Sequence, residues 1–119
     1  MDKLLLEEVI ARYKHPKHRG DTKSKCCKKC SAKNLSCGDD VVLYIGIQSG
    51  KIANASFNGS LCSIANYGAD LLCESVIGKT VGEAKSITSQ ELLKTNTGLL
   101  GNPVRLKCFE LAQDALKLL

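Results

Sequence analysis

The sequence contains no tryptophan and few aromatic residues of any kind, with two Phe and three Tyr among 119 residues. Proteins that bind single-stranded nucleic acid need aromatic side chains on which bases stack, interleaved with basic ones. The basic run from Lys14 to Lys29 contains no aromatic residue, and Asp21 is its only acid. We therefore interpret this run, and the net charge of +5, as a solvated basic loop and expect no nucleic-acid partner.

Long apolar runs are missing as well. No stretch approaches the roughly 18 apolar residues of a membrane span, and acids interrupt the apolar run that a signal peptide would need near the start. No repeat or linker divides the chain, and a domain of this length buries enough surface to fold without disulfides. We expect a single domain over residues 1–119, located in the cytoplasm, with no membrane partner.

Cysteine, by contrast, is abundant, with seven in the chain. In a reducing compartment an odd number of thiols indicates metal ligands, sulfur carriers or core residues rather than a disulfide framework. Four of them lie in "KCCKKCSAKNLSCGDD", residues 25–40. The question is whether this stretch belongs to one metal site, to two, or to a disulfide knot.

The apolar spacing predicts a helix first and a hairpin second. Residues 5–13 have helical periodicity, with Asp2 as a cap, and Pro16 ends the pattern. Two β-branched runs, "VVLYIGI" and "IANASF", are separated by a short polar segment in which Gly50 supplies the turn. We expect these runs to form an antiparallel hairpin.

The remainder of the chain is predicted to be helical. Residues 62–77 suit a buried helix closed by Gly78, and Thr80 and Thr88 are expected to cap two short helices. Asn102 as cap and Pro103 at the first helical position begin a long C-terminal helix with one apolar face. This order predicts an α+β domain: a small antiparallel sheet with helices packed on one face, an N-terminal helix and a long C-terminal helix.

Three cysteines fall where such a fold gathers loop ends and helix ends. Cys37 precedes the hairpin, Cys62 begins a helix and Cys108 lies in the first turns of the last helix. The helix dipole is expected to lower the thiol pKa, most of all for Cys62. Asp39 extends to the same side as Cys37, with Gly38 allowing the backbone to bend. Three thiolates and one carboxylate would complete a tetrahedral metal site.

Burial is the alternative for each cysteine, since Cys is among the most buried residue types. Cys108, taken alone on its apolar face, suits the core better than a metal site. Cys73 follows Cys62 by eleven residues, which places it roughly 16 Å further along the same helix. We expect Cys73 to be a core residue.

The motifs "SCGDD", "FNGSLCSIANYGADLL" and "PVRLKCFELAQDALKLL", in this order, resemble the IscU/NifU-type (NifU N-terminal-like) iron–sulfur cluster assembly scaffolds. The resemblance begins at "VIARYKHPKHRG" and covers nearly the whole chain. It implies an IscU/SufE-like fold in which Cys37, Asp39, Cys62 and Cys108 bind a [2Fe-2S] cluster, or zinc as an alternative occupant.

The resemblance also implies a function. A scaffold of this family is not a self-contained enzyme: it accepts sulfur from a cysteine desulfurase, assembles the cluster and passes it to apo-proteins or carrier proteins. We expect a monomer or a homodimer. A hard carboxylate at Asp39 among soft thiolates would leave an edge at which incoming thiols displace it, which suits transfer.

The sequence departs from the family at the last cysteine. The chaperone-linked branch has His before this cysteine, where this chain has Lys107, and "GNPVRLKC" only partly matches that branch's chaperone motif. "RLKC" is similar to the zinc-binding SufU branch, whose extra segment between the second and third ligand cysteines is absent here. Lys107 could favour a thiolate at Cys108, making it the persulfide acceptor, or could be an ordinary surface lysine.

Two other functions remain open: a zinc-dependent, SufU-like sulfurtransferase and a small structural zinc module. The resemblance says nothing about Cys26, Cys27 and Cys30. We expect these three on a mobile lysine-rich loop near the main site, where lysines lower their pKa and make them accessory sulfur or metal handlers. Dispensable thiols on an exposed loop, or a second zinc site, are the alternatives.

Overall fold

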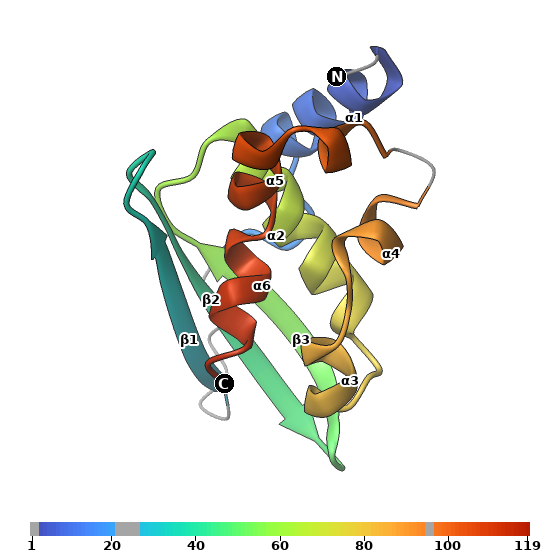
Figure 1. The fold of residues 1–119 in the computed structure, drawn as a ribbon. Coiled ribbons are helices and arrows are strands. Elements are labelled where there is room, and N and C mark those ends of the chain that lie inside the picture. The colour runs from blue at the N-terminus through green and yellow to red at the C-terminus, as the bar shows by residue number, and fades with distance from the viewer. Residues whose placement is uncertain (1–2, 21–26, 95–96) are drawn as a thin grey trace.

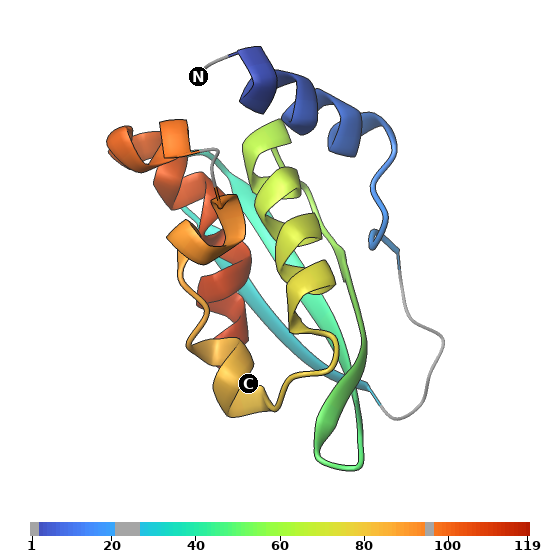
Figure 2. The ribbon, with the colours of Figure 1, turned by 90° about the vertical axis from the view of Figure 1, so that its right-hand side faces the viewer.

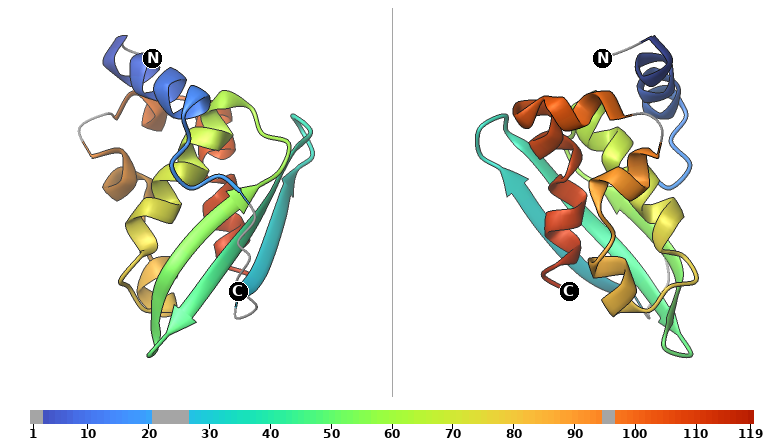
Figure 3. Two further views of the ribbon diagram at one scale, coloured as in Figure 1. Left: turned by 180° about the vertical axis from the view of Figure 1, so that it is seen from behind. Right: turned by 45° about the vertical axis from the view of Figure 1, so that its right-hand side comes forward.

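The computed structural model describes residues 3–20, 27–94 and 97–119 (Figure 1). Its sheet has three antiparallel strands in the order β1 (Cys27–Asn34), β2 (Asp39–Gln48) and β3 (Lys51–Asn58). Helices α2 and α6 pack on one face of this sheet. The left view of Figure 3 shows the molecule from behind, and the right view shows the helices in front of the sheet. The predicted α+β class and the one-sided helical layer are therefore confirmed.

The helical elements are α1 (Lys3–Lys14), α2 (Ser63–Val76), α3 (Val81–Lys85), α4 (Ser89–Leu93), the 3-10 helix η1 (Thr97–Gly101), α5 (Pro103–Phe109) and α6 (Leu111–Leu116). Thr80 and Thr88 cap α3 and α4 as predicted, each in a capping box with the Glu three residues later. None of the described helices is long and apolar enough to cross a bilayer.

The β2–β3 hairpin forms where the sequence predicted it. Ser49 (φ 55°) and Gly50 (φ 76°) both have positive φ, which is the requirement of a type I′ turn. The inward positions of β2 alternate along the strand, so that Val41, Leu43 and Ile45 are buried. These side chains form the floor on which the helices pack.

Strand β1 was not predicted. Residues 27–34 were expected to be a loop, but they pair with β2 in a register that sets Cys30 opposite Leu43 and Asn34 opposite Asp39. The inward positions hold Cys30, Ala32 and Asn34 instead of the β-branched residues that usually mark a strand. Cys26 lies outside the described residues, and for Cys27 only the backbone is described.

The C-terminal segment begins as predicted, with Asn102 accepting a hydrogen bond from the Arg105 N–H and Pro103 at the first helical position. It is not one helix, however, because it is divided at Glu110 into α5 and α6. The Phe109 carbonyl lies so close to Gly68 on α2 that any Cβ there would collide with it. Val104, expected on the apolar face, is exposed, whereas Phe109 is fully buried.

Helix α1 lies against α2 at the end of the sheet (Figure 2). Leu5 and Val9 are buried, while the other predicted apolar residues, Leu6, Ile10 and Tyr13, are exposed. Instead of more apolar contacts, an ion pair of 2.6 Å joins Arg12 to the fully buried Asp70. The expected cap, Asp2, lies outside the described residues.

Candidate metal centre

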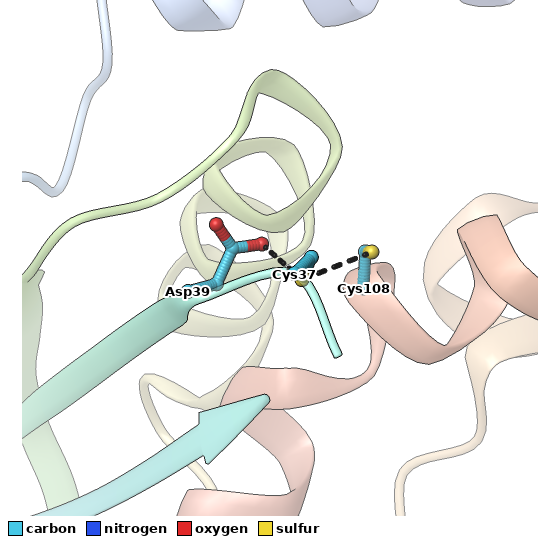
Figure 4. Close-up of side chains that lie close together, drawn as sticks. All are labelled: Cys37, Asp39 and Cys108. Atoms are coloured by element: carbon cyan, nitrogen blue, oxygen red, sulfur yellow. Dashed lines mark hydrogen bonds between the residues drawn. The ribbon is translucent and has the colours of Figure 1, made fainter. Parts of the chain in front are cut away.

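The four predicted ligands lie on three segments at one end of the sheet, and among the described residues the structure groups the ligand atoms of Cys37, Asp39 and Cys108, whereas Cys62 approaches this group through its backbone N–H. Cys37 lies in the turn between β1 and β2, Asp39 begins β2, Cys62 is the N-cap of α2 and Cys108 lies in α5. Figure 4 shows Cys37 between Asp39 and Cys108. One ligand atom from each of these three residues lies within 4.8 Å of the others.

The β1–β2 turn presents Cys37 to the centre. Gly38 has φ 75°, a conformation in which other residues are strained, and its N–H donates to the Asn34 carbonyl at 2.9 Å. The Asn34 side-chain oxygen accepts from the Ser36 N–H at 3.1 Å. The backbone and side-chain oxygens of Asn34 therefore hold the turn through two hydrogen bonds. The predicted bend at Gly38 is confirmed.

Asp39 connects two of the thiol-bearing segments. One carboxylate oxygen accepts from the Cys62 backbone N–H at 3.1 Å, and the other lies 3.1 Å from the Cys37 sulfur. Asp39 is itself buried, with 7% of its surface exposed. Asp39 therefore presents one carboxylate oxygen to the Cys37 and Cys108 thiols.

Cys62 lies at the N-terminus of α2 as predicted, and its sulfur accepts a hydrogen bond from the Ala65 N–H at 3.4 Å. The expected lowering of its pKa is wrong. Burial of the sulfur raises the pKa, and the charge of Asp39 adds to the increase, while the Ala65 N–H acts in the opposite direction. For the pKa of Cys62, desolvation of the thiol therefore outweighs the effect of the helix N-terminus.

Cys108 lies with its sulfur 3.8 Å from the sulfur of Cys37 and 3.9 Å from the side-chain nitrogen of Asn34. Burial raises the pKa of the Cys108 thiol to about 12, and the neighbouring Cys37 and Cys62 contribute. Lys107 is exposed and lines a cavity of 350 Å³ together with Cys37 and Cys108. Lys107 is not among the described groups that shift the pKa of Cys108, so the raised pKa does not support the prediction that this lysine holds Cys108 as a thiolate.

The separation of the Cys37 and Cys108 sulfurs fits a tetrahedral metal site. Two sulfurs bound to one zinc or iron at about 2.3 Å with tetrahedral angles lie roughly 3.8 Å apart. The Cys37 and Cys108 sulfurs are separated by this distance. Because bound metal requires thiolates, loading the centre would release the protons that burial retains on Cys62 and Cys108.

The remaining described cysteines are not part of this centre. Cys73 is 1% exposed in the core, which confirms the prediction for that residue. Cys30 is 7% exposed and lies four residues before Asn34, roughly 13 Å from the β1–β2 turn along the strand. Burial raises its pKa to about 11. The expected exposed loop with a lowered pKa is therefore wrong for Cys30.

Sequence reasoning missed Asn34. Its side chain is 8% exposed and contacts both the turn and Cys108. The available signal was an Asn three residues before a candidate ligand, but Asn is common beside turns for purely local reasons. Only the position of α5 in the fold shows that this Asn faces a sulfur.

Comparisons with known proteins agree with the resemblance. The chain is 30% identical over 130 residues to the iron-sulfur cluster assembly scaffold protein IscU of Thermotoga maritima, covering 97% of this chain and 92% of the relative. It is 31% identical over 114 residues to the protein of the same description from Escherichia coli, covering 93% and 87%.

A solved structure gives the same result for the fold. The putative scaffold protein for the SUF system from Fervidobacterium islandicum superposes with a TM-score of 0.78 at 28% identity, covering 94% of this chain and 93% of that one. The model of the NifU-like N terminal domain matches residues 5–118. The chain therefore belongs to the NifU-like N terminal domain family, as a relative of the IscU and SufU scaffolds.

Proposed function

We propose that this protein is a scaffold for iron–sulfur cluster assembly, in which Cys37, Asp39, Cys62 and Cys108 hold the cluster during assembly. One observation carries the proposal: a carboxylate and the Cys37 and Cys108 thiols, from segments 71 residues apart, place their ligand atoms within 4.8 Å of one another. Three soft sulfur ligands suit iron–sulfide, and the hard carboxylate is the weakest of the four partners.

In this proposal a cysteine desulfurase supplies sulfur to the centre, a [2Fe-2S] cluster forms as cargo, and apo-proteins or carrier proteins receive it. The centre lies at an exposed edge of the molecule, since the Cys37 and Cys62 residues remain exposed. A partner's thiol could therefore approach the carboxylate side. We place this activity in the reducing cytoplasm, where the thiols of the centre stay available to bind metal and sulfur.

Anaerobic reconstitution tests the proposal. The protein is incubated with ferrous iron, cysteine, a cysteine desulfurase and dithiothreitol, which reduces the persulfide sulfur to sulfide, and absorption and metal content are measured. We expect a brown protein with thiolate-to-iron charge-transfer bands, and transfer of its cluster to an apo-ferredoxin. A protein that stays colourless and keeps stoichiometric zinc under these conditions would contradict the scaffold role.

A zinc-dependent sulfurtransferase is the second candidate, favoured by Lys107, which shares a cavity with Cys37 and Cys108. In that function one ligand thiol would leave the zinc to accept persulfide sulfur, and Cys108 is the candidate acceptor. The zinc-loaded protein should then increase desulfurase turnover without forming a cluster. A structural zinc module would instead unfold on chelation, which thermal unfolding with and without a chelator measures.

A further inference from the structure

Asn34 is placed to act on two of the ligands at once. It ends β1, opposite Asp39 in the register, and its side chain is almost fully buried. The amide oxygen accepts from the Ser36 N–H at 3.1 Å, while the amide nitrogen points to the Cys108 sulfur at 3.9 Å. One carboxamide therefore joins the turn that carries Cys37 to the helix that carries Cys108.

The negative charge of a metal-loaded centre explains why a hydrogen bond from Asn34 to the Cys108 sulfur would be stabilising. Three thiolates and a carboxylate around a divalent ion leave two negative charges, and N–H donors are the means by which proteins stabilise such sulfur ligands. The Cys62 N–H faces Asp39 and the Ala65 N–H faces the Cys62 sulfur, so both of those donors are backbone groups. The donor to Cys108 is a side chain, which a substitution can remove.

We propose that Asn34 is a positioning residue of the metal centre, whose amide N–H donates to the Cys108 sulfur and orients it toward the ion. The proposal rests on the metal centre assigned under the proposed function, but not on the identity of the cargo. Asn34 contacts the ion only through Cys108. Its effect should therefore be lost when the Cys108 sulfur is absent.

Two substitutions separate this role from that of a turn residue. Asn34→Ser retains an oxygen that can accept from the Ser36 N–H, but it is too short to reach the Cys108 sulfur. Asn34→Ala loses both contacts. The matched control is Asn102→Ser, which replaces an Asn capping the helix that carries Cys108 with another good cap residue.

The experiment uses the full chain loaded with zinc alone or with cadmium alone. We expect Asn34→Ser and Asn34→Ala each to weaken zinc binding about tenfold in chelator competition, while Asn102→Ser stays within twofold. In cadmium NMR of the wild type we expect a through-bond correlation between the Asn34 side-chain proton and the metal, because the N–H···S–metal path is continuous. This correlation should be missing in both Asn34 variants.

Several results would overturn the proposal. If Asn34→Ser binds zinc like the wild type and only Asn34→Ala is weakened, Asn34 serves the turn alone. If Asn34→Ser weakens zinc a further tenfold in a Cys108→Ser background, it does not act through that sulfur. Should the serine variant fail to fold, absence of the cadmium correlation in the wild type decides against the proposal. The zinc and cadmium experiments use no iron, sulfide or desulfurase. A failure of cluster assembly would therefore contradict the scaffold role without changing the result expected for Asn34.

Discussion

The cysteines of this chain occupy two contrasting environments. Cys30 and Cys73 face the core between β1 and α2, where burial is the main cause of their raised pKa. Cys37, Cys62 and Cys108 lie at the end of the sheet, where the Asp39 carboxylate contacts the Cys37 sulfur and the Ala65 N–H donates to the Cys62 sulfur. The comparison shows that a cysteine at the end of a segment lies in a polar environment that suits a metal ligand, whereas a cysteine within a strand or helix lies in the core.

The largest effect is expected from replacing a ligand. Serine at Cys37, Cys62 or Cys108 should weaken zinc binding at least about 100-fold and abolish cluster assembly, because one soft ligand of four is lost. In Cys73→Ala, binding should be unchanged while the free energy of unfolding falls by about 1–2 kcal/mol. Chelator competition and denaturant unfolding measure the two quantities. Normal cluster yield and transfer in any one serine variant would remove that residue from the centre.

The backbone of the centre provides the next test. Gly38→Ala must adopt a positive φ, which costs about 1–2 kcal/mol, so we expect zinc binding to weaken about tenfold as the Cys37 turn rearranges. Gly101→Ala is the control, since nothing lies within 4 Å of an added Cβ and its φ is not positive. Equal zinc affinity in the two variants would show that the turn can present Cys37 with a different backbone conformation at residue 38.

The carboxylate should affect lability more than affinity. We expect Asp39→Ala to keep its cluster longer and to transfer it several-fold more slowly to an apo-ferredoxin, because the hard ligand in a soft set is the one that partners displace. Asp39→Asn controls for the hydrogen bond from the Cys62 N–H, since its amide oxygen can still accept. Faster cluster loss in Asp39→Ala under anaerobic conditions would mean that the carboxylate is an anchor.

The sequence was sufficient for the elements with strong local signals. The β2–β3 turn, the Thr caps of α3 and α4 and the start of α5 follow from residues that act within a few positions, and each is confirmed. The convergence of Cys37, Asp39 and Cys108 was also predicted, from their places at segment ends and from the family resemblance.

Other features depend on contacts between distant residues. Strand β1 carries lysines outward and Cys30 and Asn34 inward, so its composition conceals the alternation that pairing with β2 exploits. The C-terminal segment breaks at Glu110, next to Phe109, whose carbonyl lies close to Gly68 on α2, and this long-range contact is not visible in any local pattern. The pKa values of Cys62 and Cys108 are set by burial among residues from other segments, which reverses the expected helix-dipole effect.

The smallest expected effect tests the core side of the comparison through pH. In the unfolded chain the Cys30 thiol loses its proton near its ordinary pKa of 9.0, whereas in the folded protein burial raises the pKa to about 11. Between these values the unfolded state binds fewer protons, so the free energy of unfolding decreases as pH rises, by about 1 kcal/mol from pH 8 to pH 10 for this group. Well below pH 9 both states keep the proton and the group has no effect.

Replacing the thiol should remove this contribution. We expect Cys30→Ala to be less stable than the wild type at pH 8 but to lose about 1 kcal/mol less between pH 8 and pH 10, measured by denaturant unfolding of metal-free, reduced protein. Groups that do not interact with Cys30 cancel in the difference, whereas the charge of Lys85, which lowers the Cys30 pKa, and the effect of Cys30 on the pKa of Cys73 make small additional contributions. Identical pH slopes would mean that water reaches the Cys30 sulfur in the folded state. The thiol would then resemble those of the metal centre in access to solvent, and the contrast between the two environments would rest on ligand geometry alone.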